Sequence, residues 1–216
     1  MTCPWLLAVE EEFAERLRGG RLAHALLLAG PAGTGKGDLA GRFLASVLCL
    51  EGRYPACGAC RSCELLASGA HPDGHALTFE KHPKKDELRT ELVIGQIRSL
   101  TAALQLTSTI RPRKAATIRP AEAMTRSAAN ALLKTLEEPP PHVKFLFATT
   151  EVEKLPVTVL SRTQRFDLRR IPTELLEKHF EWVCEQEGVA AEEEAIRIIA
   201  GAAEGSVRDG LSILDQ

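Results

Sequence analysis

The sequence predicts an α/β fold with a parallel sheet, followed by a small helical region toward the C-terminus. Two observations predict it. First, continuous apolar runs that suit buried strands, such as 23–29 (AHALLLA) and 143–148 (VKFLFA), alternate with segments of helical spacing. Second, three helix-like segments follow one another after Pro172 with no strand between them. Alternating strands and helices form right-handed crossovers in a parallel sheet, and the last helices form a separate unit.

The individual elements follow from local patterns. Strands are expected at 23–29, 77–79, 115–118, 143–148 and 164–168. Helices are expected at 9–18, 39–50, 92–104, 126–136, 173–187, 191–202 and 206–215. Two glycines end the first helix, and three prolines from Pro139 follow the fourth. The polar stretch 80–87 is expected to be a mobile loop. We therefore expect a sheet domain over residues 1–170 and a helical unit over 171–216.

The composition is that of an ordinary globular protein. Apolar residues make up 44% of the chain, and 27 basic against 29 acidic residues leave a formal net charge of −2. The net charge therefore does not mark the chain as a nucleic-acid binder. No apolar run approaches the ~20 residues of a membrane helix, and the N-terminus is acidic where a secretory signal is basic. Four of the six cysteines are bunched rather than spread as a disulfide framework. We expect a cytoplasmic protein with no membrane partner.

A glycine-rich loop follows the first buried strand. Residues 30–36 (GPAGTGK) match the pattern G-x-x-x-x-G-K and lead directly into a helical segment. The glycines let backbone N–H groups turn toward phosphates, the lysine reaches the terminal ones, and the helix start adds partial positive charge. An ordinary glycine turn before a helix is the alternative. The candidate nucleotide-binding residues of this loop are Gly30, Gly33, Thr34, Gly35, Lys36 and Gly37.

The residues that would hold magnesium are missing. The pattern requires Ser or Thr after the lysine, because that hydroxyl ligates the metal, but the chain has Gly37. A hydrolase also needs an acidic residue after a neighbouring strand. Strand 115–118 is instead followed by Arg119 and Pro120, and Glu122 comes several residues too late. If this is the correct strand, we expect weak binding of ATP or ADP, no binding of Mg²⁺ and no intrinsic ATPase activity.

A cysteine cluster interrupts the alternating pattern between residues 49 and 63. Cys57, Cys60 and Cys63 form C-x-x-C-x-x-C, and Cys49 lies upstream. Four thiolates can close a tetrahedral structural zinc site. An iron–sulfur cluster and plain buried thiols are the alternatives. The remaining cysteines, Cys3 and Cys184, are expected to be core or surface thiols, and His71 is expected to be a loop histidine rather than a ligand.

These motifs together resemble the AAA+ subunits of bacterial sliding-clamp loaders, over nearly the whole chain. The shared motifs are GRLAHALLLAGPAGTGKG, the four-cysteine cluster, GAHPD, NALLKTLEEPP, ATT, LSRTQRF and AAEGSVRD. The first half is most similar to delta-prime subunits of DNA polymerase III, and the second half is closer to gamma/tau subunits. The resemblance implies a P-loop AAA+ parallel-sheet domain with an inserted zinc module, followed by a small helical lid. Delta-prime subunits are not motors, which agrees with Gly37 and Arg119.

The resemblance also implies site residues. Arg162 occupies the Ser-Arg-Cys position of the family, where it acts as an arginine finger in the ATP site of a neighbouring subunit; an ordinary surface arginine is the alternative. Thr163 departs from the family cysteine. Thr149 or Thr150 matches the sensor position, and Arg208 matches the lid arginine.

The function implied is that of a non-hydrolysing delta-prime subunit of the DNA polymerase III holoenzyme. Its implied partners are gamma/tau and delta subunits and, through the complex, the sliding clamp and primer–template DNA. The family also has a C-terminal collar domain, which has no counterpart in these 216 residues. A gamma/tau-type ATPase and a zinc-stabilised interaction module without a nucleotide role are the alternatives.

Overall fold

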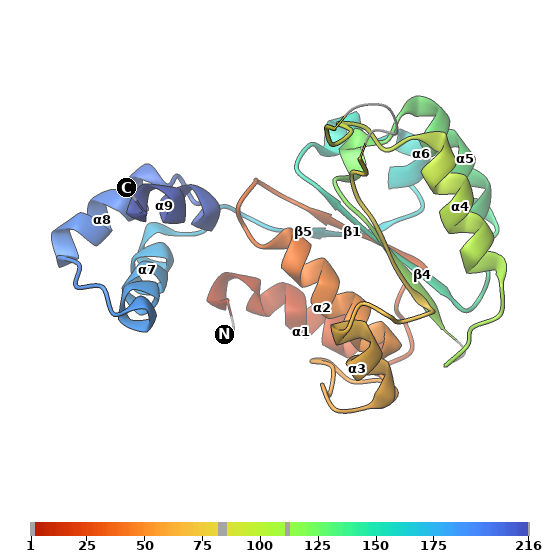
Figure 1. Ribbon diagram of the computed structural model, residues 1–216, viewed down its shortest axis with the longest axis horizontal. Coiled ribbons are helices and arrows are strands. Elements are labelled where there is room, and N and C mark those ends of the chain that lie inside the picture. The colour runs from red at the N-terminus through yellow and green to blue at the C-terminus, as the bar shows by residue number, and fades with distance from the viewer. Residues whose placement is uncertain (1–2, 82–85, 111–112, 216) are drawn as a thin grey trace.

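The computed structural model describes residues 3–81, 86–110 and 113–215 and contains a five-stranded parallel sheet (Figure 1). The strand order is β2-β3-β4-β1-β5, and every neighbouring pair is parallel. The strands are β1 Ala25–Ala29, β2 Gly74–Leu77, β3 Lys114–Ile118, β4 Val143–Thr149 and β5 Gln164–Asp167. The fold class predicted from the sequence is confirmed.

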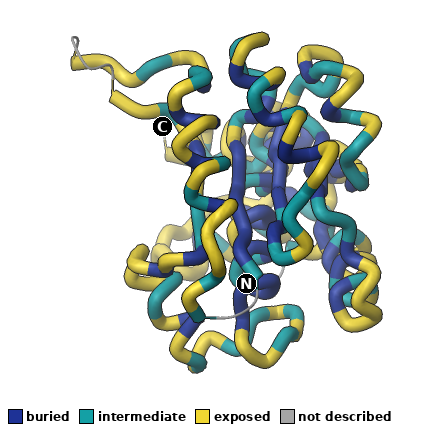
Figure 2. Tube along the Cα trace, turned by 90° about the vertical axis from the view of Figure 1, so that its right-hand side faces the viewer, coloured by how far each residue is buried: buried dark blue, intermediate teal, exposed yellow. Residues whose placement is uncertain are grey.

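Helices cover both faces of the sheet (Figure 1). One layer contains α1 Leu7–Arg18, α2 Lys36–Leu48 and α3 Arg61–Ala67. The other contains α4 Ile94–Gln105, α5 Arg126–Glu137 and the short α6 Val157–Leu160. Short 3₁₀ turns occur at Pro4–Leu6, Ala121–Ala123 and Val152–Lys154. Because both faces are covered, the central strands form the buried middle of the molecule (Figure 2).

Alternation along β1 divides the core between the two layers. Leu26 and Leu28 pack with α1 and α2, whereas Leu27 packs with α4 and α5. All five residues of β1 are buried, as are all five of β3. This explains why these strands are continuous apolar runs rather than alternating ones. Because β1, β3 and β4 are parallel, their carboxyl ends lie at the same edge of the sheet. The candidate site lies at this edge.

The C-terminal helices form a small bundle with its own core. They are α7 Thr173–Glu187, α8 Glu193–Ala202 and α9 Val207–Leu214. Leu176 and Phe180 of α7 pack with Ile196 of α8, and the ring of Phe180 closely approaches Gly210 of α9. A methyl group at Gly210 would collide with that ring, so the glycine lets α7 and α9 pack closely. No helix within the described part of the chain is long and apolar enough to cross a membrane.

Most of the elements expected from the sequence lie within a few residues of their predicted bounds. The second strand is an exception, since it occupies Gly74–Leu77 rather than 77–79. Helix α3 within the cysteine-rich stretch was not predicted. Of the expected loop 80–87, residues 82–85 lie outside the described residues, and the flanking Lys81 and Leu88 form an antiparallel bridge.

Candidate functional site

The phosphate loop lies between β1 and α2, at the carboxyl end of the central strand. Its first glycine, Gly30, donates its N–H to the carbonyl of Thr149 at the end of β4, at 3.3 Å. Within the loop, the Thr34 hydroxyl donates to the Pro31 carbonyl at 3.0 Å, and the Lys36 ammonium donates to the same oxygen. The loop is thus fixed to the sheet and closed on itself by its own lysine and threonine.

The loop's lysine has limited exposure. Lys36 is 8% exposed, and burial lowers the pKa of its ammonium group. The nearby carboxylate of Glu122 raises this pKa, and the guanidinium of Arg208 lowers it. Lys36, Glu122 and Arg208 therefore share one electrostatic environment, although they come from three different segments of the chain.

The lid rests directly on the phosphate loop. The Val207 N–H, in the first turn of α9, donates to the Gly33 carbonyl at 3.0 Å. Gly33 has φ of +72°, and a methyl group there would overlap the hydroxyl of Ser206. Only glycine accommodates both this backbone conformation and this close approach. The hydrogen bond and the packing together join the lid to the loop.

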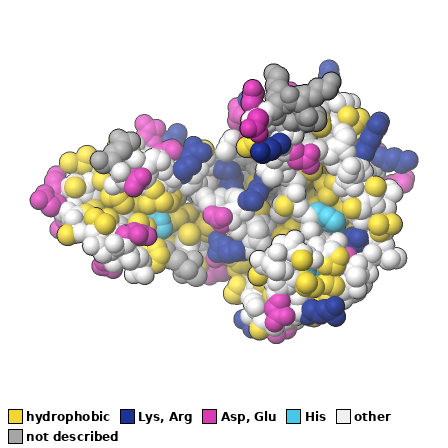
Figure 3. Space-filling view, in the orientation of Figure 1, with side chains coloured by type: hydrophobic (Ala, Val, Ile, Leu, Met, Phe, Trp, Pro, Cys, Tyr) yellow, Lys and Arg dark blue, Asp and Glu magenta, His cyan; other side chains and the backbone are white. Residues whose placement is uncertain are grey.

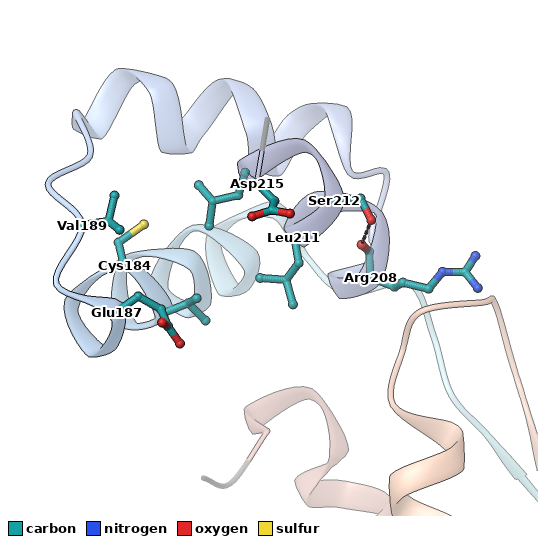
Figure 4. A pocket seen from close by; sticks show the side chains of 9 residues that line it. Cys184, Glu187, Val189, Arg208, Leu211, Ser212 and Asp215 are labelled. Carbon is teal, nitrogen blue, oxygen red and sulfur yellow. Dashed lines mark hydrogen bonds between the residues drawn. The ribbon is translucent and has the colours of Figure 1, made fainter.

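Arg208 follows at the same end of α9. Its side chain extends away from the other residues of the lid pocket (Figure 4). That pocket, of ≈ 580 Å³, is bordered largely by apolar side chains such as Val183, Val189 and Leu211. The backbone N–H of Arg208 lies 3.3 Å from the position of a Cβ built on Gly33. The structure thus brings the backbone of Arg208 next to the phosphate loop.

A smaller cavity of ≈ 300 Å³ opens beside the start of α2. Its lining includes Lys36, Gly37, Arg119, Glu122 and Thr149. The Arg119 Nη1 atom lies only 2.9 Å from where a Cβ on Gly37 would be. The strand that precedes Arg119 is β3, which is separated from β1 by β4 in the sheet. The strand chosen from the sequence is therefore not the immediate neighbour of β1, although its carboxyl end borders the same cavity. Gly37 and Arg119 thus face each other across the position where a metal would need a hydroxyl and a carboxylate.

Glu122 lies closer to this cavity than the sequence indicated. The 3₁₀ turn Ala121–Ala123 returns the chain toward β4, so that Glu122 accepts hydrogen bonds from Thr150. The Thr150 hydroxyl donates to Oε1 at 2.6 Å and the Thr150 N–H donates at 3.1 Å. Burial raises the pKa of Glu122, but hydrogen bonds from Thr150, from its own backbone N–H and from Thr149 together lower it more, and the net pKa lies below its usual value. The sequence analysis placed Glu122 too far along the chain to reach the site. This prediction is wrong, because the 3₁₀ turn brings Glu122 to the cavity.

The two candidate sensor threonines have different roles. Thr149 is 1% exposed, and its hydroxyl accepts the N–H of Glu151 at 3.1 Å. Thr150 is exposed and is bound to Glu122. Both border the cavity. The sequence left open which of the two is the sensor residue. Thr149 is a buried residue whose hydroxyl accepts a backbone N–H, whereas Thr150 is an exposed residue that donates to Glu122.

Arg162 lies on a different side of the sheet from the phosphate loop. It follows α6, whose Val159 belongs to the core beneath α4 and α5, whereas α2 covers the opposite face (Figure 1). Its guanidinium donates to the Thr158 carbonyl at 2.8 Å and to Glu137 Oε1 at 2.9 Å. The side chain is 31% exposed, and that of Glu137 is 51% exposed. Arg162 is therefore oriented by neighbours that remain open to solvent.

The four cysteines predicted as metal ligands converge. The sulfur atoms of Cys49, Cys57, Cys60 and Cys63 all lie within 4.8 Å of one another. Two of these separations are 3.9 Å, between Cys57 and Cys63, and 3.5 Å, between Cys60 and Cys63. Tetrahedral zinc with Zn–S bonds of ≈ 2.3 Å would place sulfurs about 3.8 Å apart. The residues present therefore fit a structural zinc ion.

The pKa values of the clustered cysteines shift in both directions. Burial raises the pKa of Cys60, but hydrogen bonds from the N–H groups of Leu50 and Cys63 and from the neighbouring sulfurs together lower it more, to about 6. Burial and the neighbouring sulfur of Cys60 raise the pKa of Cys63 to about 12. Because zinc binds the deprotonated sulfur, metal binding would release the proton from Cys63.

A buried polar network joins the cysteine cluster to the sheet. Ser62 donates to the Leu48 carbonyl at 2.7 Å and lies 2.8 Å from His71 Nε2. His71 Nδ1 accepts the Asp73 N–H at 3.0 Å, which leaves the ring proton on Nε2. The Asp73 carboxylate accepts the Thr109 N–H at 2.9 Å and lies 3.7 Å from the Lys114 ammonium. His71 lies in a loop, as expected, but it is buried and supports the cluster from outside.

Sequence reasoning missed two contributors to the loop. The Trp5 indole N–H donates to the Thr34 carbonyl at 3.2 Å, and its ring meets His179 of α7 edge-on, with centroids 5.4 Å apart. Ser206, which caps α9, packs against Gly33. An isolated tryptophan and a helix-capping serine carry no motif, so only the folded chain brings them to the loop.

Comparison with family models identifies this assembly of features. The model described as "DNA polymerase III, delta subunit" matches residues 7–172. The chain belongs to this family. A second model, "DNA polymerase III clamp loader subunit, ATPase lid domain", matches residues 175–216. Together they confirm the resemblance to clamp-loader AAA+ subunits that the motifs indicated.

The chain is homologous to tau/gamma clamp-loader subunits. It is 38% identical over 205 residues to DNA polymerase III subunit tau of Escherichia coli K12, covering 94% of this chain and 30% of that protein. It is 35% identical over 197 residues to subunit tau of Bacillus subtilis 168, covering 91% and 33%. The chain therefore spans about a third of the length of the curated relatives that it matches.

Solved structures confirm the fold. A gamma subunit-related protein of Thermotoga maritima is 20% identical with a TM-score of 0.51, and the match covers 93% of this chain and 57% of that one. The RuvB Holliday junction branch migration motor of the same organism is 18% identical with a TM-score of 0.60, over 97% and 60%. At these identities the likeness supports the P-loop AAA+ fold alone.

Proposed function

We propose that this chain acts as a delta-prime-type subunit of a bacterial clamp loader, a ring member that supports sliding-clamp loading without hydrolysing ATP itself. The position of the Arg119 guanidinium beside Gly37 carries this proposal. A P-loop ATPase holds magnesium there with a hydroxyl and a carboxylate, and the metal neutralises charge on the transferred phosphoryl group. A glycine and a cation supply neither ligand.

The same proposal assigns Arg162 as an arginine finger for the ATP of a neighbouring subunit. Its place in the α5–α6 layer supports this role, because α2 and the phosphate loop lie in the opposite layer. The ion pair with Glu137 keeps the guanidinium extended at the surface. Exposed ion pairs contribute only about 0–1 kcal/mol, so a phosphate of the partner's nucleotide can replace Glu137 as the anion.

We further propose a division into a sheet domain over residues 1–170, with a zinc module at 49–63, and a lid over 171–216. The other clamp-loader subunits, gamma/tau and delta, are the proposed direct partners, and homology to tau/gamma supports them. The sliding clamp and primer–template DNA would be met through the assembled complex. Zinc is the proposed structural ion, with Cys49, Cys57, Cys60 and Cys63 as ligands, and the proposed nucleotide contacts are Gly30, Gly33, Thr34, Gly35, Lys36, Gly37, Thr149 and Arg208.

Reconstituted loader tests the arginine finger. The variant Arg162→Ala should reduce ATP turnover at the site it serves by about 10³-fold or more, the range known for arginine fingers. Arg165→Ala is the matched control, because this substitution removes the same charge from the adjoining strand β5. Among the described residues, the Arg165 side chain pairs only with Asp167. A loader that retains full ATPase activity with Arg162→Ala would refute the assignment.

A gamma/tau-type ATPase is the second candidate, favoured by the identity of 38% to the tau subunit. It requires magnesium-dependent turnover by the purified chain, and that turnover must disappear in Lys36→Ala. The proposed function predicts no turnover in either protein. The two candidates are therefore separated by one steady-state ATPase assay with and without magnesium.

A further inference from the structure

Gly37 and Arg119 are one structural feature rather than two separate losses. The guanidinium Nη1 lies 2.9 Å from the position of a Cβ on Gly37. Arg119 therefore reaches into the space that a serine or threonine side chain at position 37 would occupy. The absence of a side chain at position 37 gives the cation room to lie there, whereas a hydroxyl-bearing side chain would displace this flexible guanidinium.

The Arg119 guanidinium has no partner of its own among the described residues. Its backbone N–H donates to the Leu77 carbonyl at 3.0 Å, but its side chain forms no hydrogen bond or ion pair within the described chain. Glu122, the carboxylate that borders the same cavity, is hydrogen-bonded twice by Thr150. The Arg119 guanidinium lies over the first turn of α2 and is not paired with a described carboxylate. Its N–H groups are therefore available to donate to an anion.

Other positive groups converge on the same cavity. Lys36 borders it, and its pKa shows the electrostatic influence of Arg208 from the lid. The first N–H groups of α2 have no partners within that helix, and its axis adds partial positive charge at this end. Lys and Arg side chains also lie along the junction of the lid and the sheet domain, with acidic side chains among them (Figure 3). This environment favours several negative charges close together.

We propose that this cavity binds the phosphate groups of a nucleoside di- or triphosphate without magnesium, with Arg119 in the place of the metal. A guanidinium presents planar paired donors that match two phosphate oxygens, and it retains its charge at any physiological pH. A nucleotide that carries magnesium would bring the metal against Arg119 with no hydroxyl ligand at Gly37. The site therefore selects the metal-free nucleotide and holds it as a fixed ligand. This inference deepens the proposed function and rests on it.

Binding of a fluorescent ATP derivative to the purified chain tests the inference. The buffer is freed of magnesium beforehand and contains no chelator, so that metal at the cysteine cluster is retained. We expect saturable binding without magnesium that becomes weaker when magnesium is added, and competition by inorganic tripolyphosphate. Arg119→Ala should weaken metal-free binding by about 10- to 150-fold, as expected for one charge-assisted hydrogen-bonding group.

Two further variants complete the experiment. Arg98→Ala removes the same charge from an exposed position on α4 and should leave affinity unchanged, with thermal melting used to verify folding of each variant. The double variant Gly37→Ser/Arg119→Asp restores both metal ligands and should bind the nucleotide more tightly with magnesium than without it.

Any of three results overturns the inference: binding by the unaltered chain that is as tight or tighter with magnesium, equal affinities for the unaltered chain and Arg119→Ala, or no binding in either buffer. None of these results bears on Arg162, whose role is measured in the assembled loader, so the failure of this inference and the failure of the proposed function are distinguishable.

Discussion

A single methyl group added at Gly33 is expected to separate the lid from the phosphate loop. In Gly33→Ala the new Cβ overlaps the Ser206 hydroxyl and must adopt φ near +72°. The left-handed conformation costs about 1–2 kcal/mol for a residue with a Cβ. Loss of the hydrogen bond from the Val207 N–H to the Gly33 carbonyl costs about 1 kcal/mol more. The expected total is about 2–3 kcal/mol, or roughly 5–10 °C in melting temperature.

Urea unfolding followed by circular dichroism and tryptophan fluorescence measures this change. Trp5 binds the loop through Thr34 and contacts the lid through His179, so its emission reports on the same junction. Gly41→Ala is the matched control, because Gly41 lies inside α2 with nothing within 4 Å of its would-be Cβ. That control should gain about 0.5–1 kcal/mol. If Gly33→Ala and Gly41→Ala were equally stable, the proposed coupling between lid and loop would be refuted.

Three further predictions concern the metal site, a buried charge and pH. Cys60→Ser should lower bound zinc below one equivalent per chain by elemental analysis, whereas Cys3→Ser should retain it; equal zinc in both variants would contradict the ligand assignment. Asp73→Asn leaves a buried lysine without its counter-charge and should cost about 3–5 kcal/mol in urea unfolding. Asp86→Asn, which removes an exposed ion pair, should cost under about 1 kcal/mol, and similar losses in the two variants would count against the buried pair. Burial lowers the pKa of His179, so the unfolded chain binds more protons and stability should fall as pH drops below about 6.5; equal urea midpoints at pH 7.5 and 5.5 would oppose this.

The strands and helices were largely predictable from the sequence. Strands that are buried on both faces of the sheet are continuous runs of apolar residues, which are easily recognised. Strands β1 and β4 read as continuous apolar runs, and α5 has a strongly amphipathic pattern that ends before three prolines. Helix α3 was missed because its seven residues lie among cysteines and glycines, where turn signals outweigh a short helical pattern. Local signals for a helix therefore fail where clustered cysteines and glycines dominate the composition.

The residue types of the site were predictable, but their distances were not. The motif alone identified Gly37 and Arg119 as departures, yet no pattern indicated that the guanidinium would fill the space over that glycine. The position of Glu122 was misjudged because a 3₁₀ turn brings a residue back toward the sheet in a way that counting along the chain does not reveal. The contact of Ser206 with Gly33 depends on how the lid docks, which is a property of tertiary packing.

The close approach of Arg119 to Gly37 also makes the effect of a substitution at one position depend on the residue at the other. A serine introduced at position 37 alone would displace the flexible guanidinium but leave a cation beside the new hydroxyl, and an aspartate introduced at position 119 alone would face a glycine without a hydroxyl. Neither single substitution supplies both ligands of a magnesium site. The two positions therefore form one unit, and a site for the metal requires both to change together.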